Sequence, residues 1–80
     1  MPTSLRIGPY RFFFYAGDRD EPVHTHVQRE NSEAKYWLMP IRLAWNRGFS
    51  SAELRRVEKI AGQNEIRLVE IWNEYFDHDQ

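Results

Sequence analysis

The sequence contains no cysteine. This absence excludes a disulfide framework and a zinc site built on thiolates, and it is typical of a cytosolic protein. Long apolar runs are also missing, since none approaches the roughly 20 residues that span a bilayer. Residues 1–6 have no apolar centre of the signal-peptide type. We therefore expect a soluble cytoplasmic protein that makes no membrane contact.

An excess of charge of one sign is missing as well. The 80 residues include 11 Lys and Arg against 12 Asp and Glu, for a net charge of −1. Such a balance provides no general attraction for nucleic-acid phosphates, so RNA is a partner that we do not favour. The length predicts a single domain, 1–80, and the aromatic content of 15% predicts a core built on large rings.

Residues with high β preference occur in short runs that predict a small sheet. Three strands are expected near 10–15, 24–29 and 33–38. Pro40 ends the third strand because proline cannot donate to a strand ladder. The looser alternation over 41–45 is compatible with a fourth, edge strand or a single helical turn, and we favour the strand.

Two of the three histidines, His24 and His26, lie two residues apart in the second predicted strand. Successive strand side chains point to opposite faces, so both imidazoles share one face. Pairing by polarity puts Val27 and Tyr36 on the core face. The opposite face then collects polar and ionisable groups around one indole: His24, His26, Gln28, Glu33, Lys35 and Trp37.

The C-terminal part of the chain has a helical pattern. Ser50 and Glu53 have the spacing of a capping box, which places the helix start near Ser51. Apolar residues then recur every three or four positions through 51–61 and 64–77. The intervening break leaves one bent helix and two helices as alternatives. The predicted fold class is α+β: a three- to four-stranded, mostly antiparallel sheet with the helix or helix pair packed on one face.

Several segments together resemble a small bacterial family catalogued as domain of unknown function, family 4160. They are Y-R-F at 10–12, E-P-V-H-T-H-V at 21–27, E-A-K-Y-W-L at 33–38, G-F-S at 48–50, and a final helix that contains Trp72. Members usually carry Pro-Pro-His-x-His-Val, whereas this chain has Val23 at the second proline. The resemblance implies one half of a two-gene cassette of the toxin–antitoxin type, and it implies no particular chemistry.

A metal site is one interpretation of the histidine pair. Imidazoles at i and i+2 can converge on one ion, and a carboxylate from Asp20, Glu21 or Glu33 is the available third ligand. Two histidines without cysteine leave a stable site short of donors. We therefore expect no bound metal or other cofactor, with His24 and His26 as the only candidate imidazole ligands.

Two functions remain open on the histidine face. In the first, His24, His26, Trp37 and Lys35 form an open surface that binds a partner, either a cognate small protein or a second copy of the chain. In the second, the protein is a metal-independent ribonuclease, with His24 and His26 as acid and base and with Lys35 and Arg11 stabilising the transition state. We favour the interaction module.

Overall fold

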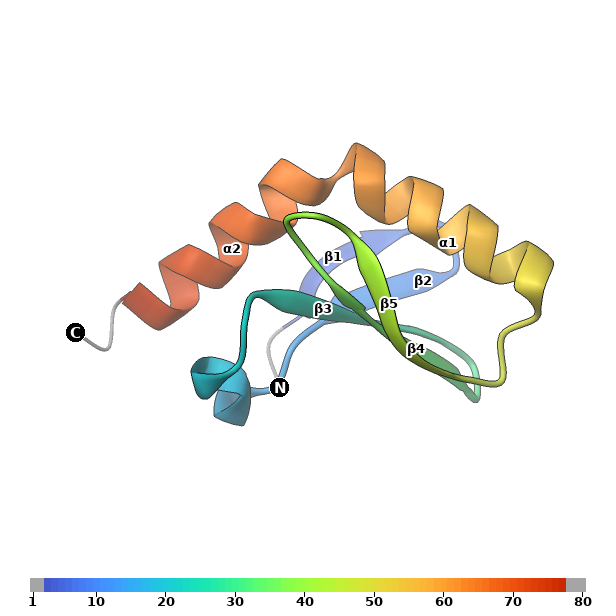
Figure 1. The fold of residues 1–80 in the computed structure, drawn as a ribbon, viewed down its shortest axis with the longest axis horizontal. Coiled ribbons are helices and arrows are strands. Elements are labelled where there is room, and N and C mark those ends of the chain that lie inside the picture. Colours follow the sequence, from blue (N-terminus) through green and yellow to red (C-terminus); the bar gives the residue numbers. More distant parts are fainter. Residues whose placement is uncertain (1–2, 78–80) are drawn as a thin grey trace.

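The computed structural model describes residues 3–77 and shows an α+β fold (Figure 1). Five antiparallel strands form one sheet in chain order, so each strand pairs with its neighbour in the sequence. These strands are β1 (Thr3–Ile7), β2 (Tyr10–Phe13), β3 (His24–Arg29), β4 (Ser32–Trp37) and β5 (Arg42–Arg47). Short turns suffice to connect consecutive antiparallel strands, which explains how so small a domain holds five of them.

The sheet has more strands than the three or four predicted from the sequence. The additional strand is β1, where Leu5 and Ile7 pack on the core and Arg6 between them points to the other face. The favoured edge strand after Pro40 is present as β5. The strand expected over 10–15 ends at Phe13 instead, because the chain turns there into a short 3₁₀ helix, η1 (Ala16–Asp20).

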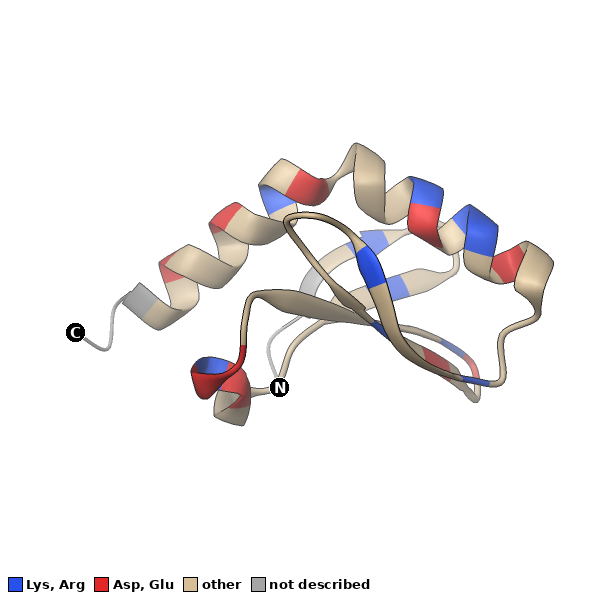
Figure 2. Ribbon diagram, viewed as in Figure 1, with Lys and Arg blue, Asp and Glu red and all other residues tan. Residues whose placement is uncertain are grey.

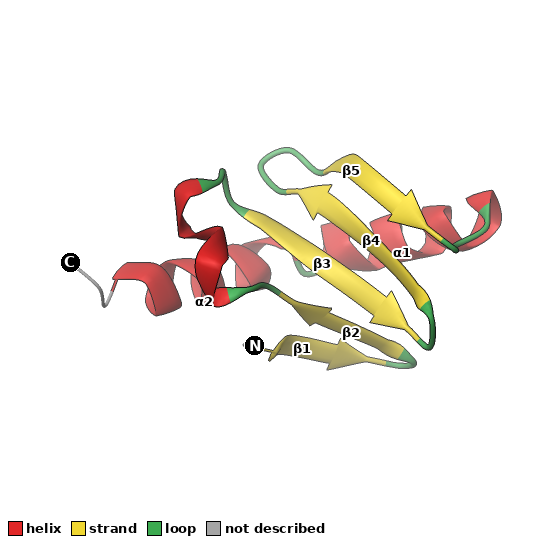
Figure 3. Ribbon diagram, turned by 90° about the horizontal axis from the view of Figure 1, so that it is seen from below, coloured by secondary structure: helices red, strands yellow, loops and turns green. Residues whose placement is uncertain are grey.

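Two helices cover one face of the sheet, and in the described part of the chain the other face carries only the short η1 at one end of β3 (Figure 3). The core lies between the layers and is built from the face predicted by polarity, with Val27, Ala34 and Tyr36 fully buried. Helical residues Val57 and Ala61 complete this core. None of the helices within residues 3–77 is long and apolar enough to cross a bilayer.

The helical region divides into two helices, α1 (Ser51–Gln63) and α2 (Glu65–Asp77), which decides between the two alternatives. Asn64 separates them, and its side-chain amide donates a hydrogen bond to the carbonyl of Ile60 at 2.8 Å. At the start of α1 the Ser50 hydroxyl accepts from the Glu53 amide at 3.1 Å. The reciprocal bond of the expected capping box, from the Ser50 amide to the Glu53 carboxylate, was predicted wrongly. The Glu53 carboxylate bonds Arg29 of β3 instead.

A smaller aromatic cluster lies beside the main core and joins α2 to the end of β2. Phe14 contacts Trp72 and Phe76, with ring centroids 5.3 Å apart in both pairs. The Trp72 ring also lies 4.9 Å from the imidazole of His24. This contact places α2 against the beginning of β3, where the histidine pair is located.

Candidate functional site

The histidine pair lies at the start of β3, where η1 packs against it. Two backbone hydrogen bonds hold the 3₁₀ turn, from the Asp18 amide to Tyr15 and from the Glu21 amide to Asp18. The Tyr15 amide in turn donates to the Asp18 carboxylate at 2.9 Å. These bonds fix the carboxylate of Asp18 in a buried position beside the imidazoles.

His24 bridges η1 and the backbone before β3. Its Nδ1–H donates to the carbonyl oxygen of Pro22 at 2.8 Å, and its Nε2 lies 2.9 Å from Asp18 Oδ2. The side chain is completely buried between neighbouring rings, among them Trp37 at 5.6 Å between centroids. The imidazole therefore has a fixed position, with Nε2 directed at the carboxylate.

His26 lies beside the same carboxylate. Its Nε2 is 3.4 Å from Asp18 Oδ2, and its Nδ1 is 3.5 Å from Glu33 Oε2. Neither nitrogen forms a hydrogen bond, although both are buried. The ring stacks on Phe13 at 5.3 Å and meets Tyr15 edge-on at 4.8 Å. A buried polar side chain without a hydrogen bond is unusual in a folded protein.

The proton affinities of this cluster follow from its burial and its charges. Burial lowers the pKa of His26 below its ordinary value, and the neighbouring His24 lowers it further, against the opposing effects of Asp18 and Glu33. Burial alone would raise the pKa of Asp18. The hydrogen bond from the Tyr15 amide and the interactions with both histidines outweigh that effect and lower this pKa. His26 is therefore favoured as a neutral imidazole beside a charged carboxylate.

The other predicted site residues lie on the same face of the sheet. Lys35 pairs directly with His26 across β3 and β4, and its ammonium bonds the Glu21 carboxylate and lies 4.4 Å from the Trp37 ring. Arg11 lies one strand further, donating to Gln28 at 2.7 Å. His24, His26, Lys35 and Trp37 therefore share one face as predicted, and Arg11 lies on that face as well.

The expectation that the two histidines lie on an open surface is wrong. His24 is 1% exposed and His26 is 5% exposed. Asp18 and Tyr15, from the loop before β3, and Trp72, from α2, lie against them. A general acid–base pair must reach its substrate, so this arrangement does not support a ribonuclease in which both histidines contact RNA.

Asp18 is the site residue that sequence reasoning missed. The candidate carboxylates were Asp20, Glu21 and Glu33, yet Asp18 is the one placed between both imidazoles. One clue in the sequence is that Asp18 lies only six residues before His24. One tight turn between them can bring the carboxylate back to the strand beside the imidazole. Which of the loop acids points inward depends on the 3₁₀ turn.

The uncovered face collects most of the basic side chains of the sheet. Cross-strand pairs place these residues on one face: Arg6 opposite Arg11, Lys35 opposite His26 and Trp45, and Arg42 opposite Trp37. Arg47 joins them opposite Glu33. Figure 2 shows basic positions on β1, β2 and β5, whereas acidic and basic positions alternate along α1. The charge of the chain is balanced overall but uneven between the two faces.

Two partly exposed aromatic side chains on this face contact His26. Trp45 is 38% exposed, and its ring lies 5.9 Å from His26. Tyr15 is 40% exposed, and its ring meets the same imidazole edge-on. The buried histidine cluster therefore has a partly exposed aromatic surface above it.

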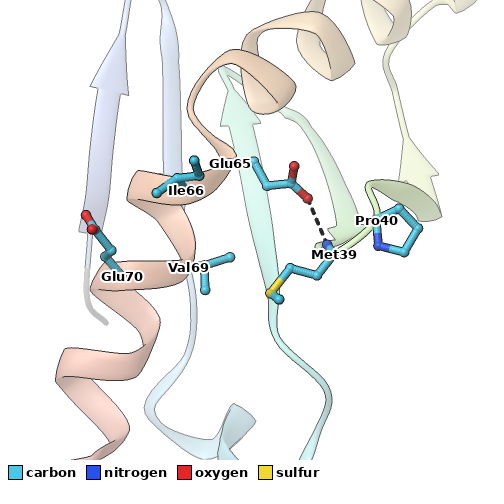
Figure 4. Close-up of a pocket in the computed structure, with 6 residues that line it drawn as sticks. All are labelled: Met39, Pro40, Glu65, Ile66, Val69 and Glu70. Atoms are coloured by element: carbon cyan, nitrogen blue, oxygen red, sulfur yellow. Dashed lines mark hydrogen bonds between the residues drawn. The ribbon is translucent and has the colours of Figure 1, made fainter.

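A separate hollow lies on the helical side, between the β4–β5 loop and the start of α2 (Figure 4). Met39, Pro40, Ile66 and Val69 provide its apolar lining. The carboxylate of Glu65 accepts a hydrogen bond from the Met39 amide at 2.9 Å. This carboxylate ties the loop to α2, and no histidine, lysine or arginine lines the hollow.

The comparison with known families gives one result. Residues 10–73 match the model of a family described as "Domain of unknown function (DUF4160)". No curated protein and no solved structure matches the chain. The matched region extends from β2 into α2 and contains Asp18, both histidines and Trp45.

Proposed function

Because the chain belongs to the DUF4160 family, a family of unknown function, we propose from its own surface that it is an interaction module. Its setting in a two-gene, toxin–antitoxin-like cassette is what the family resemblance implies. The partner is a cognate small protein that presents carboxylates around an apolar patch. It binds the uncovered sheet face, here called the basic face and defined by Arg6, Arg11, Lys35, Arg42, Trp45 and Arg47.

The arrangement of cations on the basic face carries this proposal. Arg6 and Arg11 are directly opposite on neighbouring strands. Two guanidinium groups at such positions raise the local positive potential, which a partner that presents carboxylates would complement. Arg42 is exposed on β5, the edge strand opposite β1, so positive charge lies toward both edges of this face. Complementary rim charges of this kind accelerate association and select partners.

The exposed aromatic rings of Trp45 and Tyr15 support a protein partner in particular. Trp45 and Tyr15 are both partly exposed, and both rings contact the buried imidazole of His26. Tryptophan and tyrosine dominate binding energy at the centres of protein interfaces. Binding of single-stranded RNA depends on a continuous basic groove. Here Lys35 and Arg47 already pair with Glu21 and Glu33, which interrupts such a track.

The proposal is tested with the purified chain and the purified product of the adjacent gene, using titration calorimetry. We expect Trp45→Ala and Arg42→Glu each to weaken binding at least tenfold. Ile66→Ala and Arg55→Glu are the matched controls, because both residues are exposed on the helical side, and they should leave the affinity unchanged.

Several outcomes would overturn this proposal. One is the absence of binding, and another is an equal loss of affinity in the helical-side controls. Binding of single-stranded RNA that Trp45→Ala abolishes would replace the protein partner by RNA. Self-association lost in the same variant, measured by sedimentation, would make a second copy the occupant of the face.

A further inference from the structure

We propose that Asp18, His24 and His26 form a site for one divalent transition-metal ion. One donor atom from each of the three residues lies within 4.8 Å of the other two, and Asp18 Oδ2 is close to Nε2 of both imidazoles. This inference is independent of the partner proposed for the basic face, because it depends only on buried groups. It also differs from the sequence-based expectation of no metal, because the missing third donor is Asp18.

The distances agree with a shared ion. Asp18 Oδ2 lies 2.9 Å from His24 Nε2 and 3.4 Å from His26 Nε2. Imidazole nitrogen and carboxylate oxygen bind Zn²⁺ at about 2.0–2.2 Å, so neighbouring ligand atoms in a tetrahedral or octahedral site lie about 2.9–3.5 Å apart. The carboxylate is therefore placed relative to each imidazole as an adjacent ligand would be.

The second nitrogen of His24 has the hydrogen bond that metal-bound histidines usually make, and the second nitrogen of His26 lies near a carboxylate without a hydrogen bond. His24 Nδ1 donates to the carbonyl of Pro22, and His26 Nδ1 faces the carboxylate of Glu33 at 3.5 Å. Metal-binding histidines typically donate their other N–H to a carbonyl or a carboxylate, which fixes the tautomer and orients the ring. Both rings direct Nε2 toward Asp18, and the bond to Pro22 leaves the Nε2 lone pair of a neutral His24 free for an ion.

An ion at this position would also explain the hydrogen bonding of the cluster. With Nδ1–H bonded to Pro22, a neutral His24 directs a lone pair at the Asp18 carboxylate. His26 has no hydrogen bond at either nitrogen although it is buried. A cation between the three donors turns these unfavourable contacts into coordination bonds. A protonated His24 would satisfy its own contacts but would leave His26 unpartnered.

The chemistry of the donors limits the class of metal. Two imidazoles and one carboxylate suit Zn²⁺, Fe²⁺, Co²⁺ and Mn²⁺ rather than the all-oxygen preference of Ca²⁺. Three protein ligands leave at least one coordination position for water or a small anion. The Asp18 side chain is 12% exposed beside Tyr15, so the site has a narrow contact with solvent through which an ion can exchange.

The test uses the full chain after dialysis against a chelator. Calorimetric titration with Zn²⁺ should give one ion per chain, and Co²⁺ should produce a visible absorption band. We expect Asp18→Asn and His26→Ala to abolish binding, and Glu33→Gln to weaken it by about 10–100-fold with unchanged stoichiometry. Asp20→Asn is the matched control, since Asp20 is exposed on the same 3₁₀ helix.

Circular dichroism establishes whether each variant is folded. If His26→Ala unfolds, Asp18→Asn still tests the site, because it removes the charge of the side chain but little of its volume. Nitrogen-15 spectra of the histidines provide a second readout, because Zn²⁺ should shift the Nε2 resonances of His24 and His26 only. Absence of Zn²⁺ and Co²⁺ binding would overturn the proposal. So would binding that persists in folded Asp18→Asn or that is lost equally in Asp20→Asn.

Discussion

Tyr36 illustrates how the environment of one residue changes its proton affinity. The side chain is fully buried in the core, and its hydroxyl donates to the Leu54 carbonyl at 3.2 Å. Burial raises the pKa of Tyr36 to about 12, with a smaller contribution from Glu58. An unfolded chain releases the same proton near its ordinary value of about 10.

This difference predicts a loss of stability at alkaline pH. Below pH 10 both states keep the Tyr36 proton, and its contribution to stability is complete. Between pH 10 and 12 only the unfolded state releases it, so the free energy of unfolding should fall by up to about 1.4 kcal/mol per pH unit. Urea unfolding of wild type and Tyr36→Phe from pH 9 to 11.5 measures this slope. An equal slope in both proteins would contradict the assignment.

The histidines and Asp18 show at the same scale what strand periodicity predicts and what it does not. Alternation correctly placed His24 and His26 on one face, because the side-chain period of a strand is a local property. Their burial was not predicted. It depends on Asp18 and Tyr15, positioned by a 3₁₀ turn, and on Trp72 from a helix far along the chain.

At the scale of elements, α1 is attached to the sheet at its first turn. The Glu53 carboxylate accepts from the Arg29 guanidinium of β3, with Nη2 to Oε1 at 2.7 Å, and from the Tyr10 hydroxyl of β2 at 2.9 Å. The capping spacing from Ser50 to Glu53 predicted the helix start. It could not predict the direction of the carboxylate, because the competing arginine is distant in sequence.

The two adjacent serines at this start provide a matched test of the cap. Only Ser50 accepts the amide of Glu53, while Ser51 is exposed as the first helical residue. Ser50→Ala should therefore lower the free energy of unfolding by about 1 kcal/mol. Ser51→Ala should change it by no more than about 0.5 kcal/mol, because alanine is a better helix former. Urea unfolding followed by circular dichroism measures both, and equal effects would show that the cap does not stabilise α1.

At the scale of the whole molecule, α2 holds together the sheet, the β2 end and the histidine cluster. Trp72 is the residue through which it does so, contacting Phe14, Phe76 and His24. A domain of this size has a total stability of about 4–12 kcal/mol at 0.05–0.15 kcal/mol per residue. The contacts of Trp72 therefore account for a large fraction of the free energy of unfolding.

Two tryptophans allow this to be tested within one chain. Trp72→Ala should destabilise the protein by about 3–5 kcal/mol, since it removes a buried ring and leaves a cavity. Trp45→Ala, on the exposed edge strand β5, should cost no more than about 1 kcal/mol. Thermal unfolding followed by circular dichroism distinguishes them. A larger loss of stability in Trp45→Ala would contradict the assignment of Trp72 to the core.

The sequence by itself determined the α+β class, the core face of β3 and β4, the start of α1 and the sharing of one face by His24 and His26. These features depend on periodicity, capping and turn residues, which act over a few positions. The tertiary structure alone decided that β1 completes the sheet, that the histidines are buried and that Asp18 joins them. Each of these features depends on contacts between segments that are distant in the sequence. A local pattern of a few residues does not contain the free energy of such contacts.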